Sequence, residues 1–214
     1  MMKRAFQPTG LCLAILGSDG AGKSTLLERL QTQLRPTFPE QQTLHFRPGI
    51  FEKKKTGVVT DPHGRAPRNV FLSWLKVGYY FVDFWAGWWL VILPARRLGR
   101  LIIFDRSFDD LLVDQRRYRL QGTATLVRVL RHLLPGADRT FILTAPAKVL
   151  QERKPELPLV ELERQQEVFR QLANTGKSYV LVSAEQPPEQ VAQKVLREVM
   201  TMVARENPQH HKKG

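Results

Sequence analysis

Nine residues near the start of the chain have the composition and spacing of a phosphate-binding loop. They are Gly17, Ser18, Asp19, Gly20, Ala21, Gly22, Lys23, Ser24 and Thr25, and they match the pattern G-x-x-x-x-G-K-[ST]. The glycines allow the backbone to curl, so that successive N–H groups point at phosphate oxygens. Lys23 can reach the terminal phosphates, and the Ser24 hydroxyl can bind Mg²⁺. We therefore predict that all nine residues bind a nucleotide, with ATP and Mg²⁺ as the cofactors.

A second group that could do chemistry is the carboxylate of Asp105 followed by the guanidinium of Arg106. The pair comes directly after the apolar run 101–104. In open parallel sheets ligands bind at the carboxyl ends of the strands, so Asp105 should face the same cleft as the 17–25 loop. Asp105 can hold Mg²⁺ through water, with Ser24 as the other metal ligand, and Arg106 can bind a second anionic group. The alternative is a strand-end aspartate that caps the next turn beside a solvated arginine.

The elements that must position these groups alternate along the chain, as is typical of an α/β protein. Apolar runs predict five strands, at 11–16, 43–46, 101–105, 140–144 and 179–183. Helical patterns cover 23–34, 69–93, 108–120, 123–134, 147–174 and 190–205. We predict a P-loop NTPase three-layer sandwich, in which helices cover both faces of a five-stranded, mainly parallel sheet and form a lid. Residues 1–206 should be a single domain with its lid at about 147–165, and 207–214 a disordered tail.

Composition and charge narrow the class of protein. The chain has 214 residues, of which 43% are hydrophobic and 25% charged, as in ordinary globular proteins. The single cysteine fits a reducing compartment, and we expect a cytoplasmic protein. Thirty-three Lys and Arg against 20 Asp and Glu give a formal charge of +13, which favours anionic partners. The absence of an N-K-x-D motif counts against a GTPase.

The apolar stretch 71–93 is long enough to span a bilayer. It contains Lys76 and Asp83, and each charge would cost roughly 2.5–3.5 kcal/mol at the centre of a membrane helix. We therefore expect no transmembrane segment here. Contact of its tryptophans with a membrane surface is a less favoured alternative.

The motifs together resemble those of the thymidylate kinase-like P-loop kinases. Gly17 to Thr25 looks like the P-loop of that family, and Asp105-Arg106-Ser107 is similar to its D-R-[YHS] motif. Arg47-Pro48-Gly49 resembles its R-E-P-G turn. The runs 138–143 and 179–184 resemble the strand before its lid and its final strand, so that the likeness covers about residues 10–205.

The resemblance implies transfer of the ATP γ-phosphoryl to a nucleoside monophosphate, with dTMP as the first candidate. Asp19 would lie beside the acceptor, Arg106 would bind its phosphate, and Arg153 would be the lid arginine. Lys23, Asp105, Arg106 and Arg153 then form the predicted catalytic set. For Arg153 the alternative is an exposed helical arginine paired with a neighbouring glutamate, and Lys154 and Arg164 are the other candidate lid cations. The expected partner is a small-molecule acceptor, with no specific nucleic acid; because relatives pair through helices, a homodimer is a further candidate.

Two segments with which that family holds its acceptor, A-D-R-x-x-[HQ] and S-S-x-A-Y-Q, are absent. In the helix 69–93, one face instead carries Lys76, Tyr80, Asp83 and Gly87. This stripe could line an acceptor pocket or form a partly buried ion pair across two turns. The opposite side is predicted to pack in the core; it comprises Phe71, Leu75, Val82, Trp85 and Trp89.

The charged residues after the D-R motif also allow two interpretations. Asp109, Asp114, Arg116 and Arg117 could contact the acceptor or form a solvated helix face. Two alternative functions therefore stay open. One is a P-loop kinase of a sugar or another small metabolite, and the other is a nucleotide-dependent binding protein that contacts nucleic acid or a membrane.

Overall fold

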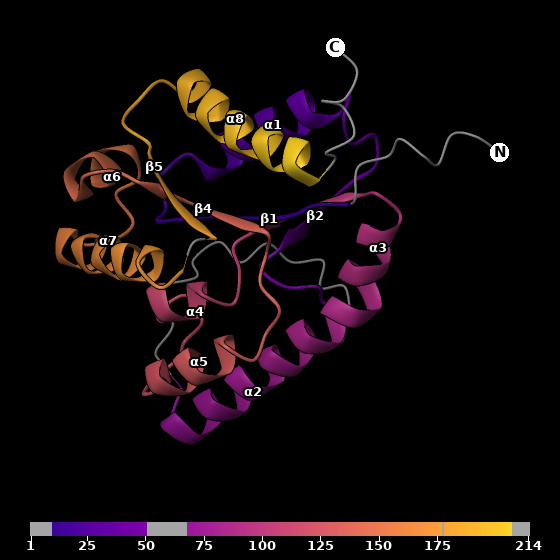
Figure 1. Cartoon of the computed structure of the whole chain (residues 1–214). Coiled ribbons are helices and arrows are strands. Elements are labelled where there is room, and N and C mark those ends of the chain that lie inside the picture. Colours follow the sequence, from indigo (N-terminus) through magenta and orange to yellow (C-terminus); the bar gives the residue numbers. More distant parts are fainter. Residues whose placement is uncertain (1–9, 51–67, 177, 207–214) are drawn as a thin grey trace, which may run out of the picture.

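A computed structural model describes residues 10–50, 68–176 and 178–206 of the chain (Figure 1). At its centre is a five-stranded sheet with the strand order β2-β3-β1-β4-β5, and every neighbouring pair is parallel. The strands are β1 (Cys12–Gly17), β2 (Gln41–His45), β3 (Leu101–Asp105), β4 (Arg139–Thr144) and β5 (Tyr179–Ser183). The predicted α/β sandwich is confirmed, with a sheet that is wholly parallel. The predicted tail 207–214 lies outside the described residues.

Helices cover both faces of the sheet (Figure 1). On one face lie α1 (Lys23–Leu34) and α8 (Pro188–Glu206), which pack on the side chains of β1, β3 and β4 in the largest apolar cluster. The other face carries α2 (Val70–Gly87), η2 (Trp88–Ile92), α3 (Leu93–Arg97), α4 (Asp110–Val113), α5 (Ala124–Arg131) and α7 (Leu159–Ala173). The short α6 (Ala147–Arg153) follows β4. This arrangement places the ends of β1 and β3 side by side.

Three predicted helices differ from the structure. The stretch expected to be mostly helical over 147–174 is divided into α6 and α7 by residues 154–158. The helix expected at 108–120 is only the four-residue α4, because the Asp114 side chain accepts a hydrogen bond from the Arg117 backbone N–H at 3.0 Å and starts a turn. The helix expected to stop before Pro94 continues as η2 and α3 to Arg97. In the π-helical η2 the Leu93 N–H donates to the Trp88 carbonyl, and Pro94, which has no N–H, follows at the start of α3.

The prediction of which side of α2 faces the core was wrong. The buried side carries Ser73, Val77, Tyr80, Asp83 and Gly87. The residues expected in the core are each 50% to 70% exposed; they are Phe71, Leu75, Val82, Trp85 and Trp89.

The reason for this orientation lies in the turn that follows β2. The Asp83 carboxylate accepts hydrogen bonds from the Arg47 side chain at 3.3 Å and from the Gly49 backbone at 3.1 Å. Gly87 lets the helix approach so closely that a Cβ there would lie 2.2 Å from Pro48 Cγ. The polar stripe is therefore a buried support for the turn. Its ion pair joins Asp83 to Arg47 and not to Lys76, which donates to the Tyr118 carbonyl at 2.6 Å.

In the part of the chain that the structure describes, no helix combines the length and the apolar character that crossing a membrane requires.

Two glycines of α2 give a matched test of this packing. Gly87→Ala should lower the free energy of unfolding by about 1–3 kcal/mol, because the new methyl group collides with the Pro48 ring. Gly78→Ala should raise it by about 0.5–1 kcal/mol, because no atom lies within 4 Å and alanine is the better helix former. Urea denaturation measures both, and equal effects of the two substitutions would contradict the observed orientation of α2.

Candidate nucleotide and acceptor site

The loop between β1 and α1 has the backbone of a phosphate cradle. Gly20 and Gly22 both adopt a φ of 84°, which L side chains rarely do. A Cβ at Gly20 would also lie 2.9 Å from the Leu150 carbonyl oxygen of α6. Ser24, one residue into α1, is exposed at the open side of the loop. The loop thus presents backbone N–H groups and the N-terminus of α1 to one point in space.

Lys23 is buried within this loop. Its Nζ donates to the carbonyl oxygens of Gly17 at 2.8 Å and of Ser18 at 2.9 Å. Burial, together with the nearby charge of Arg106, lowers the pKa of Lys23 to about 8. An anionic partner would therefore stabilise the charged ammonium group. Phosphate oxygens can replace the carbonyl oxygens that it contacts.

Adjacent strands β2 and β3 end in the same way. His45 and Asp105 are partners in the sheet register, and each is followed by a left-handed residue, Phe46 with a φ of 67° and Arg106 with a φ of 76°. The His45 Nδ1 atom lies 2.9 Å from Asp105 Oδ2. Although burial raises the pKa of Asp105, this contact and the charges of Arg106 and Lys23 hold it below its usual range. Asp105 is therefore an ionised carboxylate at the cleft.

Arg106 is a buried cation held by two carboxylates. Its Nη2 donates to Asp19 Oδ1 at 2.6 Å, and its Nη1 donates to Asp110 Oδ2 at 2.9 Å. Burial opposes the charge, but these carboxylates hold the pKa of Arg106 above its ordinary value. A left-handed backbone is uncommon for a non-glycine residue and persists where the surroundings fix it, often at functional sites.

Asp19 of the P-loop lies at the centre of four cations. Besides Arg106, it faces Arg117 Nη1 at 3.1 Å, Lys23 Nζ at 3.6 Å and Lys154 Nζ at 3.6 Å. Despite burial, these charges hold the pKa of Asp19 well below its usual range. Asp110 also pairs with Arg106 and Glu156 with Lys154, so three carboxylates face four cations and the remaining positive charge attracts a further anionic group.

The predicted catalytic residues lie around one cavity of about 420 Å³. It is lined by Asp19, Gly20, Gly22, Lys23, Ser24, Thr25, His45, Asp105, Arg106, Arg117, Arg153 and Lys154. A second cavity of about 290 Å³ adjoins it and shares Gly20, Gly22, Thr25 and Arg153; it is also lined by Ala184, Gln186, Pro188 and Val191. Ser24 and Asp105 supply the hydroxyl and carboxylate oxygens that Mg²⁺ prefers, so the residues present fit the predicted metal.

The cations of the predicted lid have different positions. Arg153 donates from Nη1 to the Ala184 carbonyl at 2.9 Å, and among the described residues it forms no ion pair with Glu152 or Glu156. It therefore bridges α6 and the segment after β5 at the wall of both cavities. Arg164 instead binds Glu161 and the Val113 carbonyl, away from the cavity.

The ambiguous residues after the D-R motif also separate. Arg117 reaches Asp19 in the cavity, whereas Arg116 is exposed. Asp114 is buried and fixes the turn that aims Arg117. Asp109 is buried and faces away from the P-loop.

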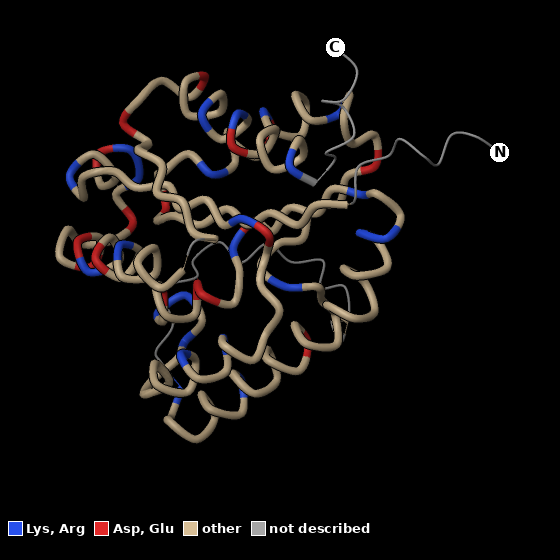
Figure 2. Tube along the Cα trace, in the orientation of Figure 1, with Lys and Arg blue, Asp and Glu red and all other residues tan. Residues whose placement is uncertain are grey.

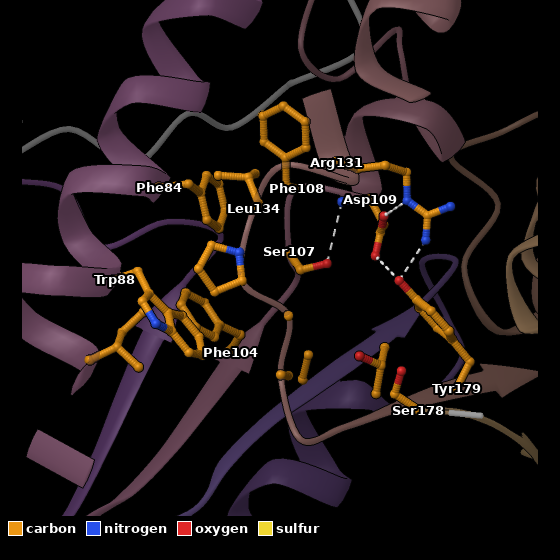
Figure 3. A pocket seen from close by; sticks show the side chains of 16 residues that line it. Phe84, Trp88, Phe104, Ser107, Phe108, Asp109, Arg131, Leu134, Ser178 and Tyr179 are labelled. Carbon is orange, nitrogen blue, oxygen red and sulfur yellow. Dashed lines mark hydrogen bonds and ion pairs between the residues drawn. The ribbon is translucent and has the colours of Figure 1, made fainter. Parts of the chain in front are cut away.

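Asp109 belongs to a separate pocket on the face of the sheet that α2 and α5 cover, seen in Figure 3. Its carboxylate lies 2.7 Å from Arg131 Nε and accepts a hydrogen bond from the Tyr179 hydroxyl at 2.8 Å. The rest of the pocket is mainly aromatic and apolar, with Phe84, Trp88, Phe104, Phe108 and Leu134 among its walls. This cluster ties the segment directly after Arg106 to α5 and β5, and so helps to fix the arginine.

Sequence reasoning missed one contact that holds the P-loop itself. The Ser18 hydroxyl donates to Gln165 Oε1 at 2.8 Å and accepts from Gln166 Nε2 at 3.0 Å. All three side chains are buried, and both glutamines belong to α7. Two adjacent glutamines in a polar helix give no signal of this kind in the sequence.

The sheet, the glycine loop and the strand-end Asp-Arg pair define a P-loop nucleotide-binding protein. No protein-family model matches the chain. Over 209 residues it is 27% identical to a thymidylate kinase of Lactobacillus acidophilus, covering 89% of this chain and 94% of that protein. A probable thymidylate kinase of Methanosarcina barkeri is 22% identical over 215 residues, covering 92% and 98%.

The fold gives the same result. The crystal structure of thymidylate kinase from Ehrlichia chaffeensis matches with a TM-score of 0.60 at 16% identity, covering 90% of this chain and all of that one. The chain is thus similar to thymidylate kinases in sequence and in fold, and the resemblance predicted from its motifs is confirmed.

The Ser18 contact predicts a loss of stability that its short side chain alone would not suggest. Ser18→Ala should lower the free energy of unfolding by about 2–6 kcal/mol, because two buried amides lose a partner at about 1–3 kcal/mol each. Thr201→Ala removes an exposed hydroxyl that binds its own helix and should change stability by less than about 0.5 kcal/mol. Chemical denaturation of both variants measures this, and equal stabilities would show that α7 does not hold the loop.

Proposed function

We propose that the protein is an ATP-dependent phosphotransferase that moves the γ-phosphoryl group to a nucleoside monophosphate, with dTMP as the first candidate acceptor. One observation carries the proposal: a single cavity joins the P-loop to a second group of cations around Asp19. A protein that only binds a nucleotide needs the P-loop but not the second group of cations. That second group suits the phosphate of an acceptor, and the names of the similar proteins support this choice.

At the nucleotide end, the P-loop N–H groups would bind the phosphates and Lys23 would contact the β- and γ-phosphates. The adjoining cavity of about 290 Å³ would take the adenosine, with Arg153 at the boundary between base and phosphates. Ser24 and Asp105 would hold Mg²⁺, which when bound neutralises charge on the β- and γ-phosphates. His45 keeps one oxygen of Asp105 occupied and orients the carboxylate.

At the acceptor end, the acceptor phosphate would replace part of the Asp19 contact with Arg106 and Arg117. An oxygen of that phosphate attacks the γ-phosphorus, the bond from phosphorus to the bridging oxygen breaks, and ADP leaves with the electron pair. The protein's task is to place the two oxygens in line and to balance the spread of negative charge. Lys154 and Arg153, at the end of α6, supply cations from the segment 147–165, which we assign as the lid.

A kinase of a sugar or another small metabolite is the second candidate. It is favoured by the absence of two segments with which the family holds a nucleoside monophosphate. The α2 stripe does not replace them among the described residues, because it is buried against the 47–49 turn. Two further expectations stay predictions: a homodimer, which light scattering would test, and a cytoplasmic location.

The proposed reaction is tested by ADP release from Mg·ATP in the presence of dTMP, other nucleoside monophosphates and sugars. We expect dTMP to stimulate release and to be recovered as its diphosphate. Lys23→Ala should lower kcat at least about 10²–10³-fold, because a charged group at the transferred phosphoryl is lost. Lys194→Ala, an exposed lysine of α8, is the matched control and should retain the wild-type rate. Phosphorylation of a sugar alone would select the second candidate, and no transfer to any acceptor would contradict both.

Arg106 should act on the acceptor far more than on ATP. Arg106→Lys keeps the charge but loses the forked geometry, so the acceptor KM should rise about tenfold to a hundredfold, at about 1.5–3 kcal/mol for a charge-assisted hydrogen bond. The KM for ATP should change less than about threefold, because lysine keeps a positive charge opposite Asp19 and no residue of the P-loop itself is replaced. Arg170→Lys, on the exposed side of α7, controls for the substitution itself. Equal increases in both KM values would contradict the assigned role.

A further inference from the structure

The outward side of α2 and η2 is a long apolar surface that the proposed function does not use. We call it the aromatic face; its exposed residues are Val70, Phe71, Leu72, Trp74, Leu75, Val82, Trp85, Trp89 and Leu90. From Phe71 to Leu90 it extends about 29 Å at the rise of these helices. The two charged side chains of this stretch are turned inward, Lys76 to the Tyr118 carbonyl and Asp83 to Arg47. Exposed apolar surfaces of this extent usually mark an interaction site.

Within the described residues 68–137, which include the aromatic face, every exposed charged side chain is positive. Between residues 68 and 137 the sequence has eleven Lys and Arg, five Asp and no Glu. None of the five aspartates is exposed: Asp105 lies in the P-loop cavity, and Asp83, Asp109, Asp110 and Asp114 are buried. Arg68, Arg97, Arg116 and Arg128 are exposed. In Figure 2 most of the tube over α2 and α5 is tan, and its charged positions are mainly Lys and Arg.

These arginines lie at defined places around the face. Arg68 directly precedes α2, and Arg97 ends α3, so that one stands at each end of the helical run. Arg128 belongs to α5, which packs beside α2 in the same apolar cluster. Near the start of α2 the positive field is strong: besides burial, Arg68, Arg119 and Arg47 lower the pKa of Lys76 to about 8. Within the described residues 68–137, the apolar surface is thus accompanied by exposed arginines and by no exposed aspartate.

The charge of these arginines indicates which kind of partner surface could cover the aromatic face. A second copy would bring the same arginines together, and its described residues 68–137 would offer no exposed aspartate to pair with them. An anionic bilayer supplies both requirements, since its acyl region accepts apolar side chains and its headgroups attract arginine. Tryptophan is the side chain most enriched at that depth, and Trp74, Trp85 and Trp89 all lie on the face.

We propose that the aromatic face docks on the surface of an anionic lipid bilayer, with α2 and η2 lying parallel to the membrane plane. The contact is peripheral, because the opposite side of α2 is covered by the protein's own core and by the turn that follows β2. That turn connects the docked helix to the P-loop cavity, since Arg47 binds Asp83 and His45, two residues earlier, lines the cavity.

The test is co-sedimentation of the full chain with lipid vesicles, one set of phosphatidylcholine alone and one of equimolar phosphatidylcholine and phosphatidylglycerol. We expect binding to the anionic vesicles, weakened by salt, and little binding to the neutral ones. The four tryptophans of the chain all lie between residues 74 and 89, so a blue shift of tryptophan emission on binding reports on this face. No catalytic turnover is needed, so failure here is distinguishable from failure of the proposed reaction.

Variants locate the contact. The double substitution Trp85→Ser and Trp89→Ser should lower the vesicle partition coefficient about tenfold or more, because two interfacial anchors are lost. Val160→Ser is the matched control, since this valine is 76% exposed on α7, outside the face, and should bind like the wild type. Circular dichroism of each variant confirms that it is folded, as expected for changes at exposed positions.

Three results would overturn the proposal. One is failure of the wild-type chain to bind anionic vesicles, and another is undiminished binding by the Trp85 and Trp89 double variant. The third is a dimer, seen by light scattering, that the same double variant dissociates while vesicles are not bound. In that case a second copy of the chain covers the aromatic face.

Discussion

The buried charge of Arg106 is the constraint on which the rest of the site depends. A guanidinium taken out of water must be matched by anionic partners, and removing one of them is strongly destabilising. Asp19 and Asp110 meet this need from opposite sides, one from the P-loop and one from α4. Asp110 also accepts a hydrogen bond from the Tyr118 hydroxyl at 2.8 Å. One cation thereby fixes the P-loop, the end of β3 and the turn that aims Arg117 into a single unit.

The same principle explains why α2 buries polar residues and exposes aromatic ones. Asp83 is fully buried because Arg47 and the Gly49 backbone satisfy its carboxylate, and this contact holds the turn after β2 in place. A helix that turned its tryptophans inward would leave these groups without partners, and bulky rings would meet Pro48 where only Gly87 fits. The specific polar and close-packed contacts therefore outweigh the burial of a larger apolar surface.

Which features can be predicted from the sequence depends on how far apart in the chain the interacting residues lie. The P-loop and the Asp105-Arg106 pair can be predicted because the residues that give each its chemistry are close together in the sequence. The five strands can be predicted because each is a continuous apolar run. Periodicity also gave the two sides of α2, but not which one is buried, since that depends on Arg47 and Pro48, more than thirty residues away. The contact of Ser18 with Gln165 and Gln166 spans almost 150 residues and leaves no local trace.

The formal charge of +13 is a property of the whole sequence, but the structure gathers the cations discussed above into two groups of different shape. Five cations line one cavity, which suits a compact anion such as a phosphate; they are Lys23, Arg106, Arg117, Arg153 and Lys154. The exposed arginines around α2 are spread over a convex surface that no small ligand can span. Such a field suits an extended polyanion, and the exposed leucine and valine side chains at its centre favour a lipid surface over a nucleic acid. The positive charge, which composition alone would assign to one partner, therefore serves two partners in our proposal: phosphate groups in the cavity and a lipid surface at the aromatic face. The turn that follows β2 connects the two sites.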